Sequence, residues 1–216
     1  MKKFNKRSFL DWRSRYTWEP LDRAIYELYR LPNDFNTLNS KLLVVSRCYN
    51  TNIEKRGHNI IDKLAGSFLS TGSFGAIVRS LRSDLKTASL IKCYNNPSMY
   101  LIHGKLMQMV KKVTGSRESV FASKFLHFYA PNIFPIMDSI TEENLYGHEG
   151  IKDNGNIEND YIAHVKRMKL KDGTYDDRYC RFCFYLCRFV GYIHNKYHIS
   201  YEAISLKALD IYLYLI

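Results

Sequence analysis

The chain has 216 residues, a hydrophobic content of 46% and a formal net charge of +11. A chain of this length and content can bury a substantial core, either as one domain or as two small lobes. No apolar run approaches the length of a membrane span, which excludes a transmembrane segment, and the charge favours a polyanionic partner, nucleic acid before membrane.

The N-terminus and the cysteines bear on the compartment. Lys2 and Lys3 begin the chain as a signal peptide would, but no apolar segment follows them. The apolar residues 211–216 are too few to cross a membrane and are interpreted as part of a buried helix. Five cysteines, an odd number, favour a reducing environment over a disulfide framework. We therefore expect a cytoplasmic protein without a membrane partner.

Aromatic and basic residues are both frequent. The 17 Tyr and 12 Phe could stack on planar bases or simply fill a core, and both interpretations stay open. Basic residues cluster in segments 2–15, 79–92, 105–124 and 166–188, whereas acidic residues gather between Asp138 and Asp160. The basic segments could serve solubility alone. Together with the aromatic content they favour nucleic-acid binding.

Helical spacing of apolar residues runs through most of the chain, without an alternating strand pattern or an internal repeat. We therefore predict an all-α fold. Helices are expected, in chain order, at residues 2–15 (a lead-in helix or an arm), 21–29, 37–49, around 53–64, 76–86, 98–113, 120–130, 139–146, 161–170, 177–195 and from 200 onward. Ser98 is expected to cap the helix that it begins. Residues 66–75 and 147–160, rich in small and polar residues, are expected to be loops.

The stretch VFASKFLHFYAPNIFPIMDS, residues 120–139, combines a helix with a proline-bent turn. One face of the helix is marked as buried by Phe121, Phe125 and Phe128. Pro131 ends the helix, and Pro135 keeps the following residues extended, because the residue before a proline is disfavoured in the helical region. Lys124 lies within this helix and Asp138 stands where the next one begins. The frame could bring this amine and this carboxylate to a common cleft.

Two stretches resemble a known family. Residues 42–64, LLVVSRCYNTNIEKRGHNIIDKL, resemble the helix–loop–helix of the helix-hairpin-helix DNA glycosylases, especially the 8-oxoguanine glycosylase branch, in which an Asn-rich loop enters DNA. Residues 120–139 resemble the same family's hairpin, catalytic lysine, proline turn and catalytic aspartate. Residues 205–210 are similar to the last helix of small bacterial relatives. The family's G-x-G hairpin is not matched, since only Gly115 precedes the lysine and it lies well upstream.

The resemblance implies site residues. Lys124 takes the place of the nucleophilic lysine and Asp138 that of the aspartate. Tyr49, Asn50, Thr51 and Asn52 would contact DNA, with the Asn-rich loop filling the gap left by an extruded base. In the tight connection before residues 120–139, Arg117 is a further DNA-contacting candidate.

Each of these residues also has a purely structural interpretation. Asp138 could cap the helix that Ser139 begins, with Glu142 completing a capping box, although capping and catalysis are compatible at one residue. Lys124 could contact a phosphate from the surface or extend its apolar stem over the core. The Asn-rich loop could be a helix C-terminal turn, and Tyr49 could merely pack.

No metal or cofactor is expected. Cys180, Cys183 and Cys187 share one helical face, but no fourth ligand completes an iron–sulfur pattern, so a buried helix seam is favoured. His194 and His198 are four residues apart without the glutamate of a metalloprotease motif. His127 could line the pocket or belong to the core, and the core is favoured.

These observations combine into one hypothesis. We expect a monomeric, two-lobed helical DNA glycosylase that acts on double-stranded DNA, with an active site in the cleft between the lobes. Residues 46–137 would form the central lobe, and residues 1–45 and 138–216 the other. It would excise a damaged or modified base, such as an oxidised purine or a bulky base of viral DNA, in repair or antiviral defence, and a lyase step at the abasic site could follow. The alternatives are a non-catalytic nucleic-acid-binding protein and a toxin-like nuclease.

Overall fold

The computed structural model describes residues 2–12, 16–17, 19–51, 53–70, 72–83, 94–152 and 156–216. Within these ranges every regular element is a helix, apart from one isolated bridge between Lys2 and His148, so the fold is all-α as predicted. The elements are α1 (Lys6–Leu10), α3 (Glu19–Arg30), α4 (Phe35–Cys48), η1 (Ile53–Arg56), α5 (Ile60–Ser70), α6 (Ser73–Ser83), α8 (Pro97–Thr114), α9 (Ser119–Tyr129), α10 (Ser139–Tyr146), α11 (Glu149–Lys152), α12 (Ile157–Arg167), α13 (Asp177–Tyr197), η2 (Tyr201–Ala203) and α14 (Leu206–Leu215).

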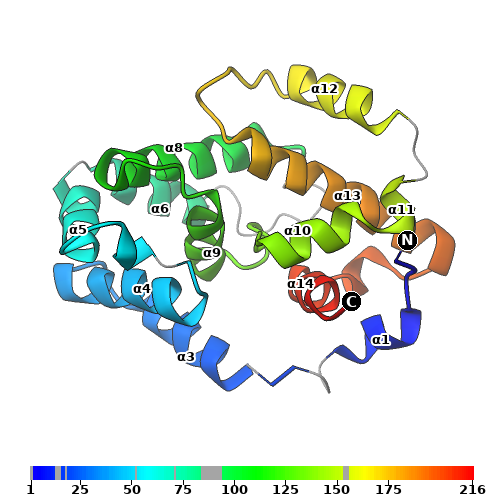
Figure 1. Ribbon diagram of the computed structural model, residues 1–216, viewed down its shortest axis with the longest axis horizontal. Coiled ribbons are helices and arrows are strands. Elements are labelled where there is room, and N and C mark those ends of the chain that lie inside the picture. The colour runs from blue at the N-terminus through cyan, green and yellow to red at the C-terminus, as the bar shows by residue number, and fades with distance from the viewer. Residues whose placement is uncertain are drawn as a thin grey trace.

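Helix α9 lies in the middle of the molecule. Helices α3, α4, α5, α6 and α8 are on one side of it, and α10, α11, α13 and α14 are on the other (Figure 1). Helix α9 contacts α3, α4 and α8 as well as α13. The residues that it contributes to the core are almost all fully buried. A side chain on α9 can therefore meet groups from both halves of the chain.

The N-terminal segment returns to the C-terminal helices. The backbone of Lys2 bonds to Gly147 and Glu149, and α1 packs against α14. Helices α3 and α4, by contrast, contact each other and α9, on the side of α5 and α8. The predicted lobe boundary at residue 46 falls inside the continuous helix α4, whereas the boundary at residue 138 coincides with the start of α10. The division into lobes stays a prediction.

Side-chain capping explains where several helices begin. The side chain of Asp34 accepts the N–H of Thr37 at 2.9 Å and begins α4, and that of Asn96 accepts the N–H of Ser98 at 3.0 Å and begins α8. Ser98 was predicted to be the cap, but Asn96 and the proline that follows it set the helix start. Gly115, with φ of 78°, ends α8 in the left-handed conformation that glycine adopts without strain.

Two predicted loops are wrong. Residues 66–70 belong to α5 and residues 73–75 to α6, so among the described residues of the first loop only Gly72 lies outside a helix. In the second, residues 149–152 form α11 and α12 already begins at Ile157. The helix predicted around residues 53–64 is divided into η1 and α5, and the last long helix begins after Ser205 instead of at residue 200.

None of the described helices combines the length and the hydropathy that a membrane-spanning helix needs.

Candidate active site

Lys124 is held near the centre of the molecule by α9. Helices α8 and α9 pack against each other across the short connection at residues 115–118, so the chain forms a helical hairpin just before the lysine. The neighbouring Phe121 and Phe125 are fully buried, and Lys124 itself is only 6% exposed. The amine is therefore largely removed from water.

The turn after α9 returns the chain to the same helix. The hydroxyl of Ser123 accepts the backbone N–H of Met137 at 3.2 Å, and His127 shares a hydrogen bond of 2.8 Å with the carbonyl of Phe134. These two bonds fix the extended residues against one side of α9. Because Ser123 precedes Lys124 and Met137 precedes Asp138, the amine and the carboxylate are placed side by side.

The Nζ atom of Lys124 lies 3.7 Å from Oδ2 of Asp138. It also donates a hydrogen bond of 3.0 Å to the backbone carbonyl of Tyr49, at the end of α4. Burial lowers the pKa of Lys124, and the negative charges of Asp138 and Asp210 only partly offset this effect. The amine is thus easier to deprotonate than an exposed lysine and has a carboxylate beside it.

Asp138 is also the N-cap of α10. Its Oδ1 accepts the backbone N–H of Thr141 at 2.9 Å, and the hydroxyl of Thr141 accepts the backbone N–H of Asp138 at 3.1 Å, which completes a capping box. The predicted box partner, Glu142, instead binds Arg178 at 2.6 Å. Capping uses Oδ1, whereas Oδ2 is the oxygen near the Lys124 amine. Asp138 can therefore cap the helix and act on the amine at the same time.

Further charged residues reach the site from both ends of the chain. Asp22 of α3 is only 3% exposed and accepts hydrogen bonds from the hydroxyls of Tyr16 and Tyr49. Lys207 of α14 lies 2.5 Å from Asp22 and 3.8 Å from Asp210, and its Nζ stands 4.5 Å from the centre of the Tyr16 ring.

Sequence reasoning did not assign these residues to the site. The signal that could have found Asp210 is a carboxylate between the apolar residues Leu209 and Ile211 of a terminal helix.

The carboxyl group of Asp210 has a perturbed pKa. The pKa of Asp210 is raised to about 6, chiefly by burial; the charges of Lys207 and Lys124 lower it, and those of Asp138 and Asp22 raise it. Perturbed carboxyl groups of this kind are typical of functional sites, although structural networks also produce them.

His127 belongs to the core, as favoured from the sequence. It is 1% exposed, and its Nε2 shares a hydrogen bond of 2.9 Å with the hydroxyl of Tyr26. With the carbonyl of Phe134 on the other ring nitrogen, both polar atoms have partners. Burial lowers the pKa of His127 to about 4, so the ring is neutral at physiological pH and holds the turn in place.

The Asn-rich loop follows α4 as predicted. Asn50 is exposed and has φ of 50°, and Thr51 donates its backbone N–H to Ser46 at 3.0 Å. These are features of a helix C-terminal turn. Tyr49 packs its ring against Phe128, with 5.1 Å between ring centres. Asn52 lies outside the described residues.

The hairpin between α8 and α9 is tied to η1, which follows this loop. Glu118 is 8% exposed, binds Arg56 at 2.7 Å and accepts the hydroxyl of Ser116 at 2.6 Å. Arg117, between these two hairpin residues, is exposed. The ion pair therefore joins η1, which follows the Asn-rich loop, to the residue next to Arg117.

The cysteines of α13 form part of its packing. Cys180 and Cys183 are fully buried, and burial raises the pKa of both thiols. His194 stacks on Tyr201 and bonds to the carbonyl of Ile199 at 2.9 Å. Among the described residues no group of three or more potential metal ligands is present.

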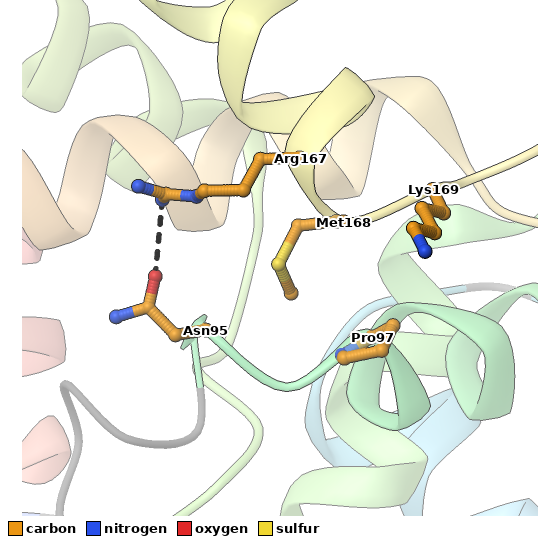
Figure 2. A pocket seen from close by; sticks show the side chains of 5 residues that line it. All are labelled: Asn95, Pro97, Arg167, Met168 and Lys169. Carbon is orange, nitrogen blue, oxygen red and sulfur yellow. Dashed lines mark hydrogen bonds between the residues drawn. The ribbon is translucent and has the colours of Figure 1, made fainter.

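Two surface hollows lie among the described residues, and neither is lined by Lys124. One is lined by Lys6, Arg7, Leu10 and Asp11, and the other by Asn95, Pro97, Arg167, Met168 and Lys169. Figure 2 shows the second, which Arg167 borders while donating a hydrogen bond of 3.2 Å to Asn95. Neither hollow corresponds to the interlobe cleft predicted from the sequence.

Comparison of the chain with protein-family models, with curated proteins and with solved structures found no match.

Proposed function

We propose that this protein is a DNA glycosylase, which extrudes a damaged or modified base from double-stranded DNA and cleaves its N-glycosidic bond. The observation that carries the proposal is the distance of 3.7 Å between Nζ of the buried Lys124 and Oδ2 of Asp138. The helical hairpin before Lys124 and the net charge of +11 support it.

The chemistry assigns different roles to the two groups. Cleavage of the bond builds positive charge on the sugar and negative charge on the departing base. Lys124, with its lowered pKa, is the nucleophile that attacks C1′ as a neutral amine. Asp138 stabilises the positive charge. The resulting covalent intermediate can rearrange to an imine, which permits a lyase step.

The contact between Lys124 and Tyr49 supports the same function. The carbonyl that accepts the lysine amine belongs to the peptide unit that leads into Asn50 and the Asn-rich loop. If Asn50 enters the DNA helix, the nucleotide that it displaces leaves the base stack and comes to lie beside the Lys124 amine. The ion pair of Arg56 with Glu118 would hold the hairpin, and with it Arg117, in register with this loop.

The proposed substrates are oxidised purines and bulky modified bases of viral DNA. Base repair and antiviral defence are the corresponding roles, in the cytoplasm and as a monomer. A non-catalytic DNA-binding protein is the second candidate, because the Lys124 amine is already engaged by Tyr49 and Asp138, and the hollows described above lie elsewhere.

The test is direct. The protein is incubated with duplexes that each carry one candidate base, and the abasic sites formed are cleaved with alkali and counted. We expect abasic sites on at least one duplex, lost in Lys124→Gln and Asp138→Asn and retained in Lys63→Gln, which changes an exposed lysine of α5. Binding without abasic sites would favour the non-catalytic DNA-binding protein. Strand cuts at unmodified nucleotides would favour a nuclease.

A further inference from the structure

Asp22 of α3 is joined to Lys124 through a single residue, Tyr49. This carboxylate is 3% exposed, and its Oδ1 accepts a hydrogen bond from the hydroxyl of Tyr49. The backbone carbonyl of the same tyrosine accepts the Lys124 amine at 3.0 Å. Asp22 therefore holds the phenol end of Tyr49, while Lys124 contacts its backbone end.

The ring of Tyr49 links these two ends stiffly. It packs against Phe128 of α9, with 5.1 Å between ring centres, and its centre lies 5.8 Å from Nζ of Lys124. A tyrosine side chain has only two rotatable χ angles. A hydroxyl fixed at Asp22 and a ring fixed at Phe128 therefore leave the Tyr49 backbone, and the carbonyl that accepts the amine, little freedom to move.

Asp22 is itself fixed from two further directions. Its Oδ2 accepts the hydroxyl of Tyr16 and lies 2.5 Å from Nζ of Lys207, on α14. Figure 1 shows α14 end-on, below α10. Hydrogen bonds to a charged group are stronger than those between neutral groups. The position of the Asp22 carboxylate is thus determined by α3 and α14 together, and Oδ1 is directed at Tyr49.

We propose that Asp22 is a positioning residue, which acts through Tyr49 to keep the Lys124 amine beside Asp138; this inference rests on the glycosylase function proposed above. Its basis is the series of contacts from Oδ1 of Asp22 to the Tyr49 hydroxyl, from the Tyr49 carbonyl to Nζ, and from Nζ to Oδ2 of Asp138 at 3.7 Å. Attack on a sugar carbon depends on such placement, because a displacement of about 1 Å can slow a reaction about 100-fold.

A loosened amine should respond in opposite ways to two kinds of aldehyde. The sugar of an abasic site is held by the DNA and meets the amine in one orientation, so an amine that is less well placed attacks it more slowly. A small dissolved aldehyde approaches from any open direction. An amine that leaves the Tyr49 carbonyl more often therefore reacts faster with it. This pair of opposite changes distinguishes positioning from a general loss of structure.

Two variants loosen the amine without touching it. Tyr49→Phe removes only the hydroxyl and keeps the ring and the carbonyl, and Asp22→Asn removes the charge at nearly the same shape. The matched control is Tyr161→Phe, because the buried Tyr161 donates a hydrogen bond of 2.8 Å to Asp177 between α12 and α13. It loses the same kind of bond away from Lys124. Urea unfolding checks that each variant folds and gives its loss of stability.

The first measurement uses a duplex with a preformed abasic site. Sodium borohydride reduces the imine that the protein forms with it, and the trapping rate is followed against protein concentration. Tyr49→Phe should lower the rate at saturation by about tenfold or more while the half-saturating concentration stays nearly unchanged. Asp22→Asn combined with Tyr49→Phe should be no slower than the slower single variant, since both remove one linkage. Tyr161→Phe should trap at the rate of the wild type.

The second measurement needs no DNA. Formaldehyde with sodium cyanoborohydride methylates amines, and mass spectrometry gives the rate at Lys124 relative to the exposed Lys63 in the same sample. Lys124 should be methylated several-fold faster in Tyr49→Phe and in Asp22→Asn than in the wild type. In Tyr161→Phe the rate at Lys124 should equal that of the wild type.

Three results would each overturn the inference: methylation of Lys124 at the wild-type rate in Tyr49→Phe, equal trapping losses in Tyr49→Phe and Tyr161→Phe, or losses that multiply when Asp22→Asn and Tyr49→Phe are combined. Failure of the glycosylase proposal gives a different result, in which the wild type releases no base and traps no abasic DNA. The methylation rates still decide in that case whether Asp22 holds the amine.

Discussion

The amine of Lys124 donates a hydrogen bond of 3.0 Å to the backbone carbonyl of Tyr49, which links the candidate nucleophile to the segment predicted to enter DNA. Tyr49 is the last residue before the left-handed Asn50, and its hydroxyl bonds to Asp22. Movement of this segment on DNA binding would therefore be transmitted to the amine.

Asp138 can be tested for catalysis separately from capping. Asn is as good an N-cap as Asp, so Asp138→Asn should change the free energy of unfolding little while removing the charge beside Lys124. We expect base excision to fall by about 100-fold or more. Asp138→Ala should in addition lower the free energy of unfolding by about 1 kcal/mol. Urea unfolding and single-turnover excision measure the two effects. A stability loss in Asp138→Ala alone, with excision intact in Asp138→Asn, would show that Asp138 acts only as the cap.

Asn50 can be tested for DNA contact separately from its backbone strain. Its φ of 50° suits glycine, so Asn50→Gly should fold normally, whereas Asn50→Ala should be destabilised by about 1 kcal/mol. If the amide fills the gap in the duplex, Asn50→Gly should slow excision by about tenfold, the equivalent of about one hydrogen bond. The measurement is excision from duplex and from single-stranded DNA, since only the duplex leaves a gap to fill. An equal effect on both would argue against insertion.

Arg117 should contribute charge to DNA binding without reading sequence. The exposed Arg117→Ala variant should weaken binding to unmodified duplex and reduce the slope of log affinity against log salt by about one unit. Fluorescence anisotropy over a salt series gives this slope. The control is Arg188→Ala, whose charge is already balanced by Asp160. If both variants change the slope equally, the effect reflects net charge and not the hairpin.

The stability of the fold should decrease in mild acid. Burial lowers the pKa of His103, His127, His148 and His164 from 6.5 to about 4. The unfolded chain therefore binds more protons than the fold between these values, and stability falls as the pH decreases from 6.5 toward 4.

Asp210 acts in the opposite direction, because its raised pKa makes the fold bind the additional proton between 3.8 and about 6. Four histidines outweigh one carboxyl, so a lower melting temperature at pH 5 than at pH 7 is expected. A melting temperature that is constant or higher at pH 5 would contradict this balance.

The relation of Lys124 to Asp138 was accessible to sequence reasoning because both lie in one short segment. The prolines fix the turn, Lys124 lies within a helix of recognisable spacing, and Asp138 begins the next helix. The spacing does not predict the two hydrogen bonds, at Ser123 and His127, that hold the turn against α9. These bonds depend on the side-chain directions in the folded helix.

Asp22, Lys207 and Asp210 could not be assigned from the sequence. They lie near opposite ends of the chain and meet only when α3 and α14 pack around α9 and α10. From the sequence alone, Asp22 is an ordinary acidic residue in the first turn of a helix. Its burial and its two tyrosine partners become visible only with the tertiary fold.

The wrong loops have a physical explanation as well. Glycine disfavours helices on average, yet tertiary packing can require it. A Cβ on Gly150 would lie 2.5 Å from the ring of Tyr192, so this glycine allows α11 to approach α13 closely. Composition alone suggests a loop at this position, although the same residue mediates contact between helices.

The most direct test of the account is the site of covalent attachment to DNA. The wild type would be trapped with sodium borohydride on a duplex from which it releases the base, and the modified peptide would be identified by mass spectrometry. The account predicts a sugar remnant on Lys124 and no adduct with Lys124→Gln. An adduct on another residue, or an undiminished release of base by Lys124→Gln, would contradict it.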